Sequence, residues 1–145
     1  MQLDVSLLHV VVRWLHVSAM AVAFGGVFLV LIAAWDRADR VTDVAKRYEW
    51  AFWSALGVLA MTGIGNLGAF GAALPEPTTP WGQTLTVKLG TVIALALISL
   101  PRTLAVSVWP SPPDPGGTRR IRAVYATTTA IFALIVAFAE LLAHR

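Results

Sequence analysis

Four long apolar stretches follow one another along the chain, separated by short segments rich in charge, proline and glycine. They cover about residues 10–34, 50–73, 83–102 and 121–143. A helix needs about 20 apolar residues to cross the roughly 30 Å hydrocarbon core of a bilayer. The pattern therefore predicts an all-α fold: an integral membrane four-helix bundle that forms a single domain over residues 1–145.

The basic residues between the spans predict how the bundle is oriented. Cytoplasmic loops carry an excess of Lys and Arg, so loops 36–47 and 109–120 are expected on the cytoplasmic side. Both termini and the loop near 74–83 then face outward, to the periplasmic side of a bacterial-type inner membrane. No basic segment and no small-residue cleavage site precede the first span, so it is expected to be retained. Eight of the eleven Lys and Arg residues lie in or beside the two basic loops: Arg37, Arg40, Lys46, Arg47, Arg102, Arg119, Arg120 and Arg122.

The amino-acid composition excludes several kinds of site and partner. The chain is 57% hydrophobic and 13% charged, and its lack of cysteine excludes disulfides, thiolate metal sites and iron–sulfur clusters. The net charge of +3 does not indicate nucleic acid as a partner, because the basic residues lie beside spans. The sequence from Gly63 to Gly68 matches the dinucleotide motif G-x-G-x-x-G. It lies inside an apolar span with no preceding strand, so we reject that interpretation.

A stripe of polar and metal-binding side chains on the first span is the main candidate for a functional site. His9, Arg13, His16 and Met20 fall within about 60° of one another on a helix. Ionisable groups at membrane depth are costly without partners, and they are therefore candidates for a functional site. His16 is the strongest of the four, while His9 is expected to be interfacial.

The other three spans place polar residues at a similar depth in the outer half of the bundle. We therefore predict one outward-facing site, with cofactor-binding candidates on all four spans. The inner half is expected to offer only three polar residues near its boundary. The outer candidates are His16, Arg13, Asn66, Lys88 and Glu140, with Thr62 beside Asn66; the inner residues are Ser54, Ser99 and Arg102.

Several sequence segments resemble the copper-resistance protein D (CopD) domain. They are residues 14–19 (WLHVSA) with Gly25 and Gly26, residues 62–66 (TGIGN), residues 79–85 (TPWGQTL), residues 87–89 (VKL) and Arg102. The family name implies copper import across the inner membrane. The chain is more distantly similar to the HemJ group of protoporphyrinogen oxidases. In that group a first-span His and a third-span Lys are associated with b-type haem, which implies His16 and Lys88 here.

Three functions remain open at this point, and haem is favoured over copper. In the first, His16 and Lys88 ligate haem b for membrane electron transfer or for a haem-dependent oxidoreductase, with Arg13 near a propionate. In the second, His16, Met20 and Met61 handle copper as soft ligands. Arg13 and Lys88 count against copper, because each positive charge at about 6 Å would repel bound Cu⁺ by roughly 3 kcal/mol at an effective dielectric constant of about 20. In the third, the chain is a non-catalytic subunit.

The partners expected from the sequence are the lipid bilayer and a redox partner, a larger membrane complex or a second copy of the chain. On span two, Gly57, Gly65 and Gly68 share a face with Ser54 and Met61. Small residues of this kind let membrane helices approach closely, or they leave room for a flat ligand. Close helix packing is the favoured explanation.

Overall fold

The computed structural model describes residues 2–68, 76 and 78–143 of the chain, and within this part every regular element is helical. The elements are α1 (Gln2–Asp36), η1 (Ala38–Arg40), α2 (Val41–Gly68), α3 (Pro80–Val108) and α4 (Pro115–Ala143). The prediction of an all-α fold with four long helices is confirmed. At 1.5 Å per residue, helices of 28 to 35 residues are about 42–52 Å long. That exceeds the thickness of a bilayer core.

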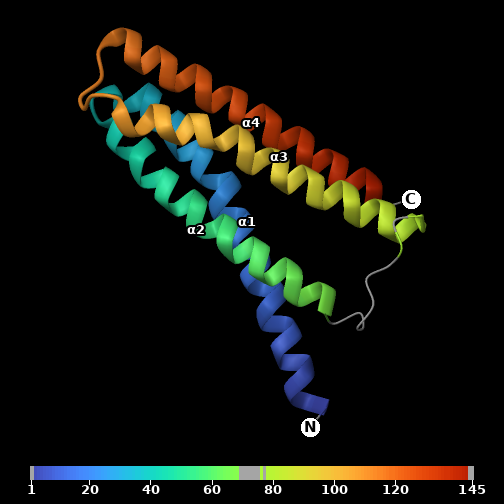
Figure 1. Cartoon of the computed structure of the whole chain (residues 1–145). Coiled ribbons are helices and arrows are strands. Elements are labelled where there is room, and N and C mark those ends of the chain that lie inside the picture. Colours follow the sequence, from blue (N-terminus) through green and yellow to red (C-terminus); the bar gives the residue numbers. More distant parts are fainter. Residues whose placement is uncertain (1, 69–75, 77, 144–145) are drawn as a thin grey trace.

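The helices form two hairpins that meet at one end (Figure 1). We call this the linker end, because residues 37–40 join α1 to α2 there and residues 109–114 join α3 to α4. Both termini lie at the opposite end, the terminal end, where the N-terminal part of α1 extends away from the other helices (Figure 1). The short, proline-rich segment 109–114 explains the second reversal, because closely spaced prolines lack the backbone N–H groups that a continuous helix needs.

The beginning of α3 shows how the sequence fixes one helix end. Thr79 is the N-cap residue, and its hydroxyl accepts a hydrogen bond from the Gly82 backbone N–H at 3.0 Å. Pro80 follows in the first turn, where its missing N–H costs nothing. The Thr-Pro-Trp-Gly segment singled out in the sequence is therefore a helix start.

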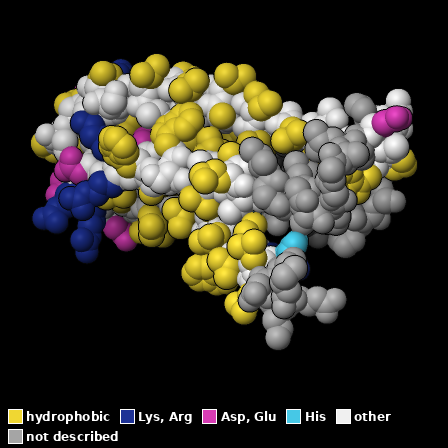
Figure 2. Space-filling model, turned by 60° about the horizontal axis from the view of Figure 1, so that its bottom comes forward, with side chains coloured by type: hydrophobic (Ala, Val, Ile, Leu, Met, Phe, Trp, Pro, Cys, Tyr) yellow, Lys and Arg dark blue, Asp and Glu magenta, His cyan; other side chains and the backbone are white. Residues whose placement is uncertain are grey.

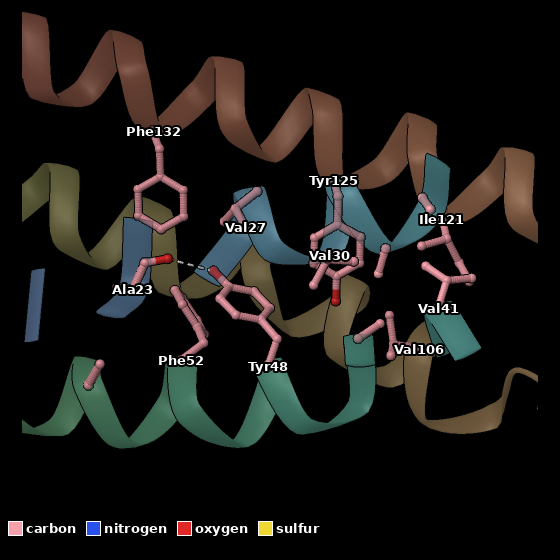
Figure 3. Packing of buried hydrophobic residues seen from close by; sticks show 14 of the residues in the cluster. Ala23, Val27, Val30, Val41, Tyr48, Phe52, Val106, Ile121, Tyr125 and Phe132 are labelled. Atoms are coloured by element: carbon pink, nitrogen blue, oxygen red, sulfur yellow. Dashed lines mark hydrogen bonds between the residues drawn. The ribbon is translucent and has the colours of Figure 1, made fainter. Parts of the chain in front are cut away.

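The buried core lies closer to the linker end than to the terminal end. Figure 3 shows α1 contributing small side chains, while α2 and α4 contribute aromatic rings. On α1, Ala19, Ala23, Val27, Val30 and Ala34 recur at helical spacing and form one buried face. The core also includes Tyr48 and Phe52 of α2, Val106 of α3, and Ile121, Tyr125 and Phe132 of α4.

Gly26 allows α1 and α2 to approach closely. A Cβ atom at this position would lie 2.5 Å from Cδ2 of Tyr48 and 2.6 Å from its Cε2. The Tyr48 hydroxyl donates to the Ala23 carbonyl at 2.8 Å, which holds the ring over Gly26. Gly57 behaves differently, because a Cβ there would meet nothing within 4 Å. Close helix packing was the favoured explanation for this face, and at Gly57 it is wrong within the chain, because Gly57, Ser54 and Met61 are exposed. The surroundings of Gly65 and Gly68 lie outside the described residues.

Much of the described outer surface is apolar. Large hydrophobic side chains are exposed along all four long helices, including Leu29 on α1, Met61 on α2, Leu104 on α3 and Leu134 on α4. Figure 2 shows such side chains spread over the body of the molecule, with Lys and Arg gathered at one end. Two of the described helical segments, Leu7–Asp36 and Pro80–Val108, are long and apolar enough to cross a membrane. Extensive exposed apolar surface of this kind is typical of contact with lipid or with partner proteins.

Candidate functional site

Towards the terminal end, a hydrogen bond joins α1 to α2. His16 Nδ1 lies 2.8 Å from the Thr62 hydroxyl oxygen. That hydroxyl has one proton, and it donates this proton along its own helix to the Val58 carbonyl at 2.6 Å. With its proton directed to that carbonyl, the hydroxyl accepts from His16, and this arrangement fits the imidazole tautomer that is protonated at Nδ1. The Nε2 atom then keeps its lone pair, as a metal-ligating histidine requires.

The structure keeps Met20 near His16 but separates Met61 from the predicted copper set. Met20 lies one turn after His16 on the same face of α1 and is 40% exposed. Met61 is 76% exposed, whereas the adjacent Thr62 faces α1, so Met61 lies on the outer surface of α2. Among the residues that the structure describes, no three His, Asp or Glu side chains are placed to hold a metal ion together.

Of the remaining predicted site residues, the structure describes the side chain of Arg13 alone. Arg13 is exposed on α1. The side chains of Asn66, Lys88 and Glu140 lie outside the described residues, although their backbones belong to α2, α3 and α4. Convergence of these three side chains on His16 stays a prediction.

Among the described side chains, the largest polar cluster lies in the other half of the bundle, around Glu49 of α2. Its carboxylate receives two hydrogen bonds from Arg102 of α3, from Nε at 2.9 Å and from Nη2 at 3.1 Å. Tyr125 of α4 donates its hydroxyl to Glu49 Oε1 at 2.5 Å. Thr103 of α3 donates to Oε2. One buried carboxylate thus connects three helices, with donors on both of its oxygens.

Aromatic rings complete the surroundings of the Arg102 guanidinium. Its central carbon lies 4.6 Å from the ring centre of Phe52, 5.5 Å from that of Tyr48 and 5.6 Å from that of Tyr125. Rings at these distances attract a cation through their negatively charged faces. Arg102 therefore has a carboxylate and three rings as partners, and we call Glu49, Arg102, Tyr125 and Thr103 the inner cluster.

Helical spacing explains why these side chains meet. Glu49 lies on the face of α2 that also carries Val41, Ala45 and Phe52. Arg102 lies on the face of α3 that carries Leu95, Ser99 and Val106. The apolar face of each helix points into the core, and one charged residue lies on each of these faces. The two charges then pair, since an unpaired charge in the core would be strongly destabilising.

The inner cluster corrects the expectation that the inner half offers only three polar residues near its boundary. That expectation omitted Glu49, which directly precedes the predicted second span, and Tyr125, which lies within the predicted fourth span. It named Ser54, which is exposed. The sequence does contain a sign of this cluster. Glu49 lies four residues after Ala45 and three before Phe52, so an acidic residue occupies the apolar face of the helix.

A family model for copper resistance protein D matches residues 42–142 of the chain. The match covers α3 and all but one residue each of α2 and α4, and it includes the whole inner cluster; α1 with His16 precedes it. No curated protein and no solved structure matches the chain. The more distant resemblance to the HemJ group gains no support from these comparisons. The matched region is more than half of the chain, and this protein therefore belongs to the copper resistance protein D family, whose members are membrane proteins.

Proposed function

We propose that this protein carries copper ions across the inner membrane, with His16 Nε2 as the atom that first binds the ion. The observation that supports this role is the hydrogen bond from His16 to Thr62, which leaves Nε2 with a lone pair to bind a metal. A neutral imidazole suits copper, and Met20 supplies a soft thioether one turn further along the same face. Copper is the substrate of this proposal and is not a resident cofactor.

The membrane placement of the proposal follows the sequence prediction. Both termini and His16 lie toward the periplasm, while the linker end with its basic residues lies toward the cytoplasm. The inner cluster then lies between His16 and the cytoplasm. There it holds α2, α3 and α4 together below the proposed entry point, with charges that are already paired.

Haem b was the favoured ligand from sequence alone, and it is not retained. The family description names copper, and the described residues provide one axial candidate, His16. The second candidate was Lys88, whose side chain lies outside the described residues. The hypothesis of a non-catalytic subunit does not explain why a hydrogen bond orients the His16 imidazole.

The experiment is copper accumulation in cells that express the protein under limiting copper. Expression of the wild type should raise cellular copper, measured by elemental analysis, and His16→Ala should abolish the increase. Thr62→Val should reduce it several-fold, because the imidazole loses the acceptor that fixes its proton on Nδ1. The matched control is His9→Ala, which changes an exposed histidine two turns away on the same helix.

A folded and inserted His16→Ala protein that accumulates copper as well as the wild type would contradict the proposal. Membrane fractionation and immunoblotting establish that each variant is present at the same level. Equal losses in His9→Ala and His16→Ala would also contradict it, since only His16 has the contact with Thr62.

A further inference from the structure

A groove of about 450 Å³ opens on the outer surface between α2 and α3. Its walls come from Lys46, Glu49, Trp50 and Trp53 of α2 and from Thr103 and Val106 of α3. The inner cluster closes one side, because Thr103 donates to Glu49 and accepts a hydrogen bond from Trp53 Nε1 at 2.9 Å. The Thr103 hydroxyl, the Glu49 carboxylate and the Trp53 indole N–H are therefore already bonded, and the groove presents mainly apolar surface.

The groove carries one unbalanced positive charge. Glu49 is paired with Arg102, so its negative charge is compensated within the core. Among the described residues, Lys46 has no ion-pair partner. A ligand that complements this groove therefore combines an apolar body with a single anionic group.

The charge and the apolar walls lie at different depths. Lys46 is close to the linker end, and Trp53 is seven residues further along α2, about 10 Å deeper at 1.5 Å per residue. On the antiparallel α3, Val106 lies nearer the linker end and Thr103 lies deeper. This order matches a molecule whose anionic head is at the membrane surface and whose chain enters the bilayer.

We propose that the groove binds an anionic phospholipid of the cytoplasmic leaflet. The Lys46 ammonium contacts the phosphate, and one acyl chain lies against Trp50, Trp53 and Val106. Tryptophan is enriched at this depth because its ring is amphipathic. The cytoplasmic leaflet is rich in anionic lipid, which basic residues near its surface attract. The inference rests on the membrane orientation given under the proposed function, but it does not depend on copper.

The test compares two lipids with the same acyl chains, dioleoyl phosphatidylglycerol and dioleoyl phosphatidylcholine. The full chain is purified in mild detergent, and the bound fraction of each lipid is measured by native mass spectrometry. The wild type should prefer phosphatidylglycerol about five-fold, which corresponds to about 1 kcal/mol for one lysine at the membrane surface. Lys46→Gln should remove the preference, and Lys46→Arg should retain it.

The matched control is Arg47→Gln, which removes a neighbouring charge that is exposed and is not part of the groove wall. This variant should keep the lipid preference. Equal binding of both lipids by the wild type would overturn the proposal, as would equal losses in Arg47→Gln and Lys46→Gln. A dimer that binds neither lipid would also overturn it, since a second copy would then cover the groove. Any of these results combined with normal copper accumulation would leave the proposed function intact.

Discussion

Glu49→Gln is expected to lower the free energy of unfolding by about 3–5 kcal/mol. The substitution keeps the size of the side chain but removes its charge, so the Arg102 guanidinium remains buried without a counter-ion. Breaking a buried pair from one side is costly for this reason. The measurement is unfolding of the purified protein by titration with a denaturing detergent, followed by circular dichroism.

Arg102→Met should cost a similar amount, because it leaves the Glu49 carboxylate buried with only hydroxyl donors. The double variant Glu49→Gln/Arg102→Met should be much closer to the wild type than the sum of the two single changes. Once both charges are gone, neither is left unpaired, and residues in direct contact are not additive.

Tyr125→Phe provides a smaller, graded comparison within the inner cluster. It removes one hydrogen bond to the charged carboxylate and preserves the aromatic ring near Arg102, so we expect a loss of about 1.5–3 kcal/mol. If Glu49→Gln costs no more than Tyr125→Phe, then the ion pair is not the main stabilising contact of the cluster.

Gly26→Ala is expected to destabilise the bundle by about 1–3 kcal/mol, although alanine is the better helix former. The new methyl group would overlap the Tyr48 ring, and the hydrogen bond from Tyr48 to Ala23 keeps that ring in place. Added volume in a well-packed core forces side chains from their preferred conformations. The same unfolding titration measures the effect.

Gly25→Ala is the matched control, because a Cβ there would meet nothing within 4 Å. It should leave stability unchanged or raise it by up to about 1 kcal/mol through helix propensity. Gly26→Ala should also cost less in a Tyr48→Ala background, since the obstacle is then absent. Equal effects of the two glycine substitutions would show that the close contact between α1 and α2 is not as described.

Hydropathy was sufficient to predict the four helices and their two short linkers. Each apolar stretch corresponds to one long helix, and the proline-rich segment 109–114 makes the second reversal. Both termini lie at one end, as two helical hairpins joined at their open ends require (Figure 1). These features depend on local sequence, because segment length and turn residues are enough to set them.

The inner cluster could not be predicted in the same way. Glu49 and Arg102 are 53 residues apart, and their contact depends on how α2 and α3 are rotated about their own axes. A search for polar residues by depth favoured the outer half, whereas a search for charges on apolar faces would have found this pair. The rotation of α2 also explains why Thr62 meets His16 while Met61 lies outside, because adjacent residues on a helix differ by about 100°.

The central claim, that His16 is a copper ligand, is tested most directly by metal analysis and an absorption spectrum of one sample. The protein is produced with ample haem and copper, purified in mild detergent and compared with His16→Ala. We expect about one copper ion per wild-type chain, loss of that copper in His16→Ala, and no haem absorption in either protein. A Soret band in the wild type that disappears in His16→Ala, without bound copper, would contradict the account and assign His16 to haem.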